Sequence, residues 1–370
     1  MDGVIFAAVV ATRIAVPLAI PRFPLPAMLA ALVMDGIDQT IFQTVTSLDL
    51  SGYQAYDKAL DVYYLSIAYV ATLRNWTNFS AYGVSRFLYY YRLVGVVLFE
   101  LTQLRWVLLV FPNTFEYFFD FYEGVRTRWD PRRMSRSLLI GGAAFIWIFI
   151  KLPQEWWIHV AQLDMTDFIK EEVFGVPAES TWTEAITANP TVVLVAAILV
   201  ALLAVLGWWL LTRRLPAADR PFTLDADSQQ PAVDKVAIRR RRERMAETFL
   251  DRELIEKVVL VSFVSVIFGQ MLPGNDGSPL GIAIGVGLVI LVNTTVSEWF
   301  IRRGRRWGTV VRQFGLMLAL NVVIVGVAGI VLRLLSAEPF QHALVFVLLL
   351  TLIVTLYDRY RPVHLTRFSR

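Results

Sequence analysis

The feature that most constrains this chain is a run of 21 residues, 191–211, that contains no charged side chain. About 20 apolar residues in a helix span the hydrocarbon core of a bilayer. Trp208 and Trp209 close the run, and Arg213 and Arg214 follow it, which is the order typical of a membrane interface and then the cytoplasm. The whole chain is 56% hydrophobic and 18% charged, whereas soluble proteins are about 25% charged. The sequence therefore predicts an all-α, polytopic integral membrane protein.

Other apolar runs predict ten or eleven transmembrane helices in all. The stretch 86–119 decides the number, because its 34 residues can be two spans or one long helix broken at Phe111-Pro112-Asn113. Eleven spans place the N-terminus outside the cell and ten place it inside, and the positions of the arginines favour eleven. Arginine clusters follow alternate spans, so we expect a multi-pass protein of the cell membrane with a cytoplasmic C-terminus. The remaining expected spans are 3–20, 25–46, 58–73, 137–152, 258–272, 280–299, 309–335 and 341–357.

These spans divide into two membrane units joined by a cytoplasmic linker. Residues 1–212 form the N-terminal unit, residues 213–256 the linker, and residues 257–370 a C-terminal unit of four spans. Within the first unit, the segment 153–190 has seven acidic residues and a single lysine, and we expect it to be an extracytoplasmic loop. The first half of the linker is rich in proline and aspartate, which is typical of a flexible connection.

The second half of the linker, residues 234–256, predicts a basic amphipathic helix. Arginines beside a cytoplasmic leaflet attract anionic lipids, so we expect this helix to contact them. A docking surface for a protein partner is the alternative. The arginines concerned are Arg239, Arg240, Arg241, Arg242 and Arg244.

Composition and motifs exclude several functional classes. The chain has no cysteine, which excludes disulfides, thiolate metal sites and cysteine nucleophiles. Its net charge of +4 comes from arginines between apolar runs, a pattern that membrane topology explains, so we expect no nucleic-acid partner. The lipid bilayer is the expected partner. Gly281 and Gly285 form a small-residue helix face that suits contacts within the chain or in a homo-oligomer.

Charged residues within the expected spans concentrate in the N-terminal unit, and such a charge is a functional hypothesis by default. Asp35 and Asp38 are at i, i+3, and Asp57 and Asp61 are at i, i+4, so each pair lies on one face of a helix. These four carboxylates could bind a divalent cation or share protons. A divalent cation is the one cofactor that the sequence suggests. Ion pairs with arginines of neighbouring helices are the structural alternative. The residues expected at a substrate or ion site are Asp35, Asp38, Gln39, Asp57, Asp61, Tyr64, Arg92, Glu100, Arg105 and Glu116.

The order Asp35-Gly36-Ile37-Asp38, then Gly52 and Asp57-x-x-x-Asp61, resembles the layout of the CDP-alcohol phosphotransferases. In that family, two aspartate motifs on consecutive membrane helices bind a divalent metal and the CDP headgroup. The resemblance covers about 27 residues and implies a metal on the four aspartates. The chain departs from the family pattern at Gln39 and at Phe42-Gln43, and it has one residue too many between Gly52 and Asp57. We therefore do not assign it to the family.

Three functions fit these features. The first is a transporter or channel-like protein that couples protons or cations through the carboxylates. The second is a membrane enzyme that acts on a lipid-linked substrate, with the aspartates holding a metal or acting as acid and base. The third is a non-catalytic assembly or scaffold protein of the envelope. The aromatic runs 87–91 and 115–122 are typical of interfacial belts, and an entrance for lipid tails is the alternative.

Overall fold

The computed structural model describes residues 2–46, 53–163, 165–214, 216–229, 236–238, 240–241, 252–270, 315–319, 322 and 340–368. The molecule is 84% helical, and its described residues contain no strand, which confirms the all-α fold. Within the described ranges, three helical segments are long and apolar enough to cross a membrane: Asp2–Ala19, Arg136–Val160 and Pro190–Gly207. The total number of spans stays a prediction.

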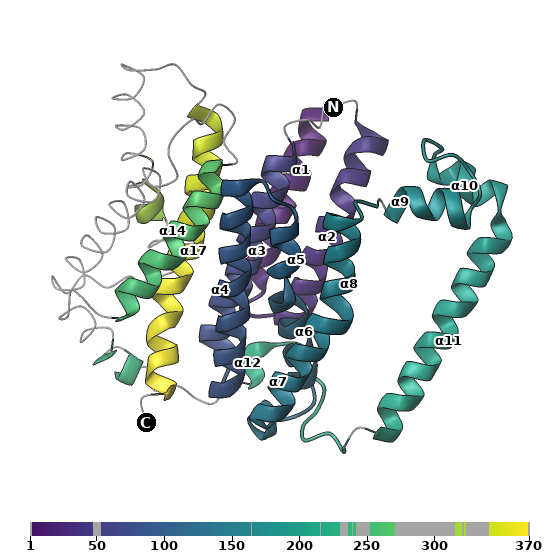
Figure 1. Cartoon of the computed structure of the whole chain (residues 1–370). Coiled ribbons are helices and arrows are strands. Elements are labelled where there is room, and N and C mark those ends of the chain that lie inside the picture. The colour runs from purple at the N-terminus through teal and green to yellow at the C-terminus, as the bar shows by residue number, and fades with distance from the viewer. Residues whose placement is uncertain are drawn as a thin grey trace.

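The N-terminal part of the chain folds into helices that stand side by side and are joined by short turns (Figure 1). Pro24 occupies the first turn of α2, where its missing N–H needs no partner. Asn78 caps α4 by accepting a hydrogen bond from the backbone N–H of Ala81 at 3.1 Å. These helices are α1 (Asp2–Ala15), η1 (Val16–Ala19), α2 (Pro24–Val45), α3 (Tyr53–Asn75), α4 (Phe79–Thr102), α5 (Trp106–Val110), α6 (Thr114–Arg126) and η2 (Pro131–Arg133).

The rest of the described chain continues the helical pattern. Thr181 and Glu184 form a capping box at the start of α10, a pair of reciprocal bonds that fixes where a helix begins. The elements are α7 (Arg136–Phe145), η3 (Ile146–Lys151), α8 (Leu152–Glu155), η4 (Trp156–Val160), α9 (Met165–Phe168), η5 (Ile169–Val173), α10 (Trp182–Ala188), α11 (Pro190–Arg214), α12 (Ala226–Gln229), α14 (Arg252–Gln270) and α17 (Phe340–Phe368).

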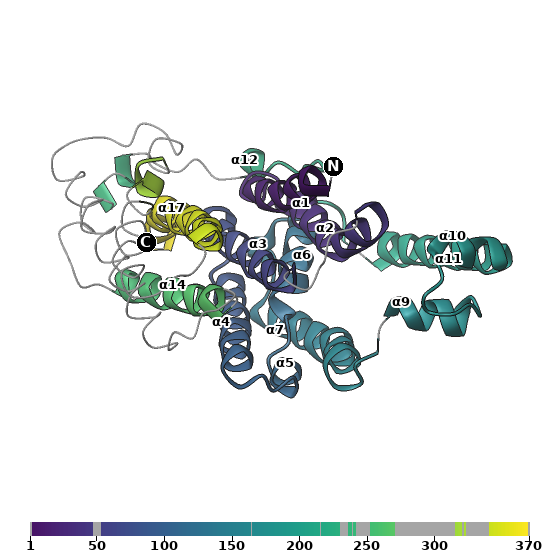
Figure 2. The ribbon, with the colours of Figure 1, turned by 90° about the horizontal axis from the view of Figure 1, so that it is seen from above.

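α3 lies at the centre of the bundle, and its residues 62–73 are all buried. At its end, the ring of Trp76 packs on that of Tyr122 of α6 at 3.9 Å between centroids. α17 packs against α3 and α14 against α4 (Figure 2). The two ends of the chain therefore contribute to one hydrophobic core.

α11 stands apart from this bundle in both views and is joined to it through α9 and α10 (Figures 1 and 2). None of its apolar window, Pro190–Gly207, is buried. An uninterrupted apolar surface of this size marks a contact with lipid or with another protein.

The stretch 86–119 reverses direction rather than forming one long helix. α4 ends where Gln103 adopts a left-handed conformation, with φ 55°. The chain then returns along α4, because the Tyr91 hydroxyl donates to the carbonyl of Val110 at 3.0 Å and Asn78 donates to the carbonyl of Pro131 at 2.9 Å. This antiparallel hairpin is the geometry that the eleven-span alternative requires.

The helix that begins at Arg136 runs to Val160, whereas we expected its span to end at residue 152 and an acidic loop to begin at residue 153. Pro153 lies in the interior of this continuous helix, at the start of α8, and its missing N–H removes one helical hydrogen bond. Wider π-helical turns, η3 and η4, flank it. Trp156 and Trp157 therefore extend this helix and do not start a separate surface segment.

Residues 216–229 are anchored to the bundle, although their composition predicts a flexible linker. The backbone N–H groups of Asp219 and Thr223 donate to the carbonyls of Arg128 at 3.0 Å and Thr127 at 3.2 Å. Acidic side chains of the segment also pair with arginines at this end of the bundle. These pairs are Asp219–Arg133 at 2.6 Å, Asp225–Arg22 at 3.8 Å, and Asp227–Arg74.

Candidate functional site

Arg13 of α1 gathers four aspartates from two neighbouring helices. Its Nη1 donates to Asp38 and, at 2.5 Å, to Asp57. Its Nη2 donates to Asp35 and, at 2.8 Å, to Asp61. These five residues form what we call the Arg13–aspartate cluster. Arg13 and Asp38 are buried, while the side chains of Asp35, Asp57 and Asp61 are 27%, 39% and 38% exposed.

Helix geometry explains why the four aspartates meet. α2 and α3 follow each other in the chain, and both pack against α1. Asp38 lies seven residues before the end of α2 at Val45, and Asp61 lies eight residues after the start of α3 at Tyr53. At 1.5 Å per residue both are roughly 10–12 Å from the turn between the two helices. The two carboxylate pairs therefore reach the same level of the bundle.

The cluster has more negative than positive charge. Among the described residues, four carboxyl groups contact one guanidinium, so the fully ionised cluster has a formal excess of three negative charges. The arginine contributes one fixed positive charge, because it stays protonated in proteins. Carboxylates that are this close to one another repel strongly unless protons or further cations neutralise some of their charges. The cluster therefore has a charge balance that attracts protons or cations.

Three of the carboxylates could share one metal ion. One oxygen from each of Asp35, Asp57 and Asp61 lies within 4.8 Å of the others. Carboxylate oxygens are the ligands that Mg²⁺ and Ca²⁺ prefer. Asp38, which we expected as a fourth metal ligand, is not part of this group and points its carboxylate at Arg13.

A second polar group lies next to the cluster and centres on Glu116 of α6. The hydroxyl of Tyr64, one helical turn after Asp61, donates to Glu116 at 2.6 Å. Asn113 donates to the same carboxylate at 2.9 Å, and the Lys151 ammonium lies 3.1 Å from it. All these side chains are buried except for that of Asp61. Tyr64 therefore connects the helix of the aspartates to an ion pair in the interior.

The other expected site residues lie outside the cluster. Arg92 is 3.8 Å from Glu155, which also accepts from His159 at 3.0 Å. Glu100 pairs with Lys58 at 3.5 Å. Arg105 is exposed and forms no ion pair with the described residues. The side chain of Gln39 lies outside the described residues.

Sequence reasoning missed Arg13, Lys151 and Glu155. A signal for Arg13 exists, because an arginine inside the expected span 3–20 is itself an unexplained charge. Lys151 and Glu155 fall at the boundary that we expected between a span and a loop. The continuous helix brings both into the bundle, where they are buried.

The basic cluster of the linker is described only in part. Arg240 and Arg241 are helical, and Arg240 is exposed. Arg239, Arg242 and Arg244 lie outside the described residues. Contact of these arginines with anionic lipid stays a prediction.

With this geometry established, we compared the chain with known proteins. No protein family, no curated protein and no solved structure matches it. The function therefore has to be argued from the site.

Proposed function

We propose that this protein is a membrane transporter or channel-like protein that moves protons or cations through the Arg13–aspartate cluster. The observation that carries the proposal is the charge balance of the cluster, in which four carboxylates face one buried guanidinium. Asp35, Asp57 and Asp61 are each more than a quarter exposed, so an arriving ion can reach them.

The arginine suits transport because it competes with the transported ion. A site that conducts or exchanges ions must bind the ion strongly enough for it to enter and weakly enough for it to leave. The fixed guanidinium of Arg13 holds all four carboxylates and so weakens the attraction for any second cation. The Tyr64 hydroxyl, which donates to Glu116 at 2.6 Å, would relay protons on the interior side of the cluster by exchange of hydrogen bonds, without losing its own proton.

The membrane topology that we infer has eleven spans, with the arginine-rich end of the bundle in the cytoplasm. α12 and the C-terminus lie at one end in Figure 1, while the N-terminus, α9 and α10 lie at the other. The first end also carries Arg22, Arg74 and Arg133, which pair with the segment 216–229. An excess of arginine in connections marks the cytoplasmic side.

A membrane enzyme with a divalent metal on Asp35, Asp57 and Asp61 is the second candidate, favoured by the spacing of their oxygens. It would act on a lipid-linked substrate. The third candidate, an envelope scaffold, is favoured by the paired charges around the cluster. These pairs are Lys58–Glu100, Arg92–Glu155 and Lys151–Glu116.

Reconstituted vesicles separate the three functions. The purified full chain is placed in liposomes that contain a pH-sensitive dye, and a pH or cation gradient is imposed. We expect gradient-driven flux in the wild type, with most of it lost in Asp35→Asn, Asp57→Asn and Asp61→Asn, because each removes an ionisable group of the cluster. Glu171→Gln, which removes an exposed carboxylate outside the bundle, is the control and should transport normally.

Other outcomes would assign a different function. Wild-type protein that passes no ion but binds Mg²⁺ or Mn²⁺ in calorimetry, with binding lost in the three variants, would favour the enzyme. Absence of both flux and binding, together with poor expression of the variants, would favour the scaffold. Flux equal to wild type in all three variants would exclude the cluster as the transport site.

A further inference from the structure

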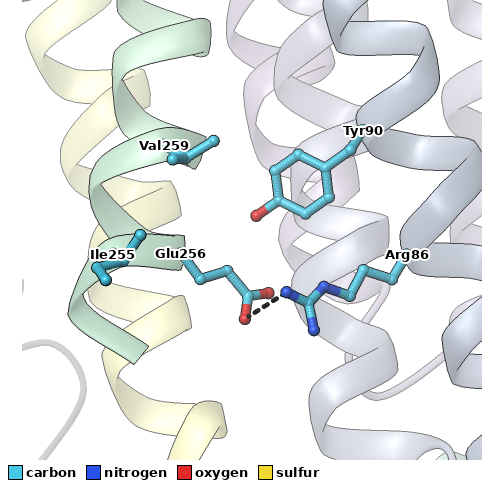
Figure 3. Close-up of a pocket in the computed structure, with 5 residues that line it drawn as sticks. All are labelled: Arg86, Tyr90, Ile255, Glu256 and Val259. Atoms are coloured by element: carbon cyan, nitrogen blue, oxygen red, sulfur yellow. Dashed lines mark ion pairs between the residues drawn. The ribbon is translucent and has the colours of Figure 1, made fainter. Parts of the chain in front are cut away.

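A second site lies between α4 and α14, on a different side of α3 from the Arg13–aspartate cluster. A hollow of about 370 Å³ lies alongside the contact of these two helices and is lined by Arg86, Tyr90, Ile255, Glu256 and Val259 (Figure 3). A neighbouring hollow of about 440 Å³ uses Arg86 and Tyr90 again, and its other walls are mainly apolar or aromatic. Both volumes lie in the range of small-molecule pockets. The additional lining residues of the second hollow are Gly83, Phe87, Tyr91, Val94 and Phe111.

The charge balance here is opposite to that of the Arg13–aspartate cluster. Glu256 is buried and accepts a hydrogen bond from the Tyr69 hydroxyl at 2.6 Å. Its carboxylate faces two guanidinium groups, that of Arg361 at 3.0 Å and that of Arg86 at 3.4 Å (Figure 3). The adjacent pair of Lys257 with Asp358, at 2.8 Å, is internally balanced. Arg86 and Arg361 therefore share one carboxylate, a formal surplus of one positive charge among these three described residues.

Arg86 is the member of this group that an outside anion can reach. Its side chain is 47% exposed, whereas that of Arg361 is 9% exposed. The ring of Tyr90 stands beside the space between α4 and α14, above Arg86 (Figure 3). The Tyr90 hydroxyl is buried and has no hydrogen-bond partner among the described residues. A guanidinium and a free hydroxyl therefore face the same hollow.

The position of Arg86 along α4 suits a lipid headgroup. Arg86 lies seven residues after the start of α4 at Phe79, roughly 10 Å along the helix axis. This end of α4 is the one that lies near the arginine-rich connections, where Asn78 contacts Pro131. Long arginine side chains near a helix end extend towards the headgroup level. Beyond Arg86, the exposed wall is formed by rings and aliphatic side chains.

From this juxtaposition we infer that Arg86 binds the phosphate of an acidic phospholipid whose acyl chains lie in the two hollows beside Arg86 and Tyr90. The surplus positive charge selects a headgroup with a net negative charge, and the apolar walls select a lipid over a free anion. The inference rests on the membrane location that we propose for α4, and it does not depend on transport by the Arg13–aspartate cluster.

Native mass spectrometry of the full chain tests this site. The delipidated protein in a mild detergent is titrated with phosphatidylglycerol and, separately, with phosphatidylcholine. One arginine beside an anionic lipid corresponds to about fivefold in affinity, so we expect the wild type to prefer phosphatidylglycerol by about that factor. Arg86→Gln should lose the preference and Arg86→Lys should retain most of it. Arg132→Gln removes an exposed arginine that pairs with Asp130 and should change nothing.

Gly83→Leu tests the apolar part of the site independently of charge. A Cβ at this position meets no atom within 4 Å, so the added side chain can extend into the hollow without disturbing the helix. We expect lower occupancy by both lipids and an unfolding temperature that is not below that of the wild type. This variant also keeps the test decisive if Arg86→Gln does not fold.

Three results would overturn the inference. The first is a preference for phosphatidylglycerol that survives in Arg86→Gln. The second is displacement of the lipid by inorganic phosphate at equal concentration, which would indicate a site for a free anion. The third is unchanged binding of both lipids in Gly83→Leu. Because the assay measures lipid binding and not ion flux, its result tests the lipid site independently of the proposed transport activity.

Discussion

At the scale of single residues, Arg13 determines the character of the proposed ion site. Its planar guanidinium has five N–H donors in a fixed geometry, and two of its nitrogens contact four carboxylates. A lysine has a compact charge and cannot span four acceptors in the same way. Each aspartate alone would be an ordinary polar residue of a helix, and the arginine makes them one site.

Removal of this arginine should destabilise the fold. We expect Arg13→Gln to lower the free energy of unfolding by about 3–5 kcal/mol, because it leaves the buried Asp38 and its neighbours without their counter-charge. The free energy of unfolding of Arg13→Lys should lie between those of Arg13→Gln and the wild type. The measurement is thermal unfolding in detergent at pH 8, with Arg132→Gln as a control for an exposed pair.

The same variant has an expected pH dependence. Protonation of the aspartates at lower pH removes the repulsion that Arg13 normally offsets. The stability difference between Arg13→Gln and the wild type should therefore be smaller at pH 5 than at pH 8. A stability difference that is larger at pH 5 than at pH 8 would show that repulsion among the carboxylates does not cause the instability of Arg13→Gln.

At the scale of elements, the close approach of α4 to the turn before α6 depends on Gly95. A Cβ built on Gly95 lies 2.1 Å from the Cβ of Phe111, a distance that no packing can accommodate. We expect Gly95→Ala to force the hairpin apart and to cost about 1–3 kcal/mol of stability. Thermal unfolding of the purified protein measures this.

Gly83 on the same helix is the matched control. The space around it is open, so Gly83→Ala should be neutral or stabilise α4 by up to about 1 kcal/mol through higher helix propensity. Equal destabilisation by the two substitutions would contradict the hairpin geometry, because only Gly95 contacts Phe111.

The anchoring of the segment 216–229 is a second property at this scale. Asp219 accepts from the backbone N–H of Asp130 at 2.9 Å and pairs with Arg133 at 2.6 Å. We expect Asp219→Ala to release the segment, seen as faster hydrogen exchange of residues 219–226, with no change in α3. Glu179→Ala, in an exposed loop, should leave exchange of the segment as it is.

Acid should release the same segment. A side-chain hydrogen bond from Arg132 holds the pKa of Asp130 below its usual value, and the same carboxylate lies 3.8 Å from the Arg220 guanidinium of the segment. A carboxylate with a depressed pKa stabilises the folded state above its unfolded-state pKa of about 3.9, and this contribution is lost as the pH falls through the lower folded-state value. The protection of residues 219–226 from hydrogen exchange, relative to the intrinsic rate at each pH, should therefore fall below about pH 4.

At the scale of the whole molecule, both ends of the chain build one core. Tyr69 of α3 binds Glu256 of α14, and Tyr82 of α4 accepts a hydrogen bond from Arg361 of α17 at 3.1 Å. The ring of His364 packs on Tyr82 at 4.0 Å between centroids. The described helices of the N-terminal and C-terminal parts therefore share buried contacts, and the expected division into two membrane units stays a prediction.

The inferred topology can be tested with single cysteines, because the chain has none of its own. We expect Gly3→Cys and Ser180→Cys to react with an impermeant maleimide added outside intact cells, and Ser228→Cys to react only after the membrane is opened. Gly3 and Ser228 are exposed, and both lie outside the buried core. Labelling of all three from one side would exclude the eleven-span arrangement.

The sequence alone determined the helical class, the apolar segments and the shared helix faces of the aspartate pairs. These properties are local, because they depend on the hydropathy of a window and on a spacing of three or four residues. The structure bears out the all-α fold and three segments able to cross a membrane. The continuation of the helix past Pro153 was not predictable from composition, since a proline within a helical pattern either ends the helix or is accommodated inside it, as Pro153 and Pro362 are.

Only the tertiary structure decided which charges meet. Arg13 and Asp61 are 48 residues apart in the chain, and Glu256 is 187 residues from Tyr69. The spacing of residues along a helix determines which side chains share a face, but the packing of whole helices determines which side chains of other helices they contact. The apolar core around α3 determines that packing, and the two opposite charge balances, one around Arg13 and one around Glu256, follow from it.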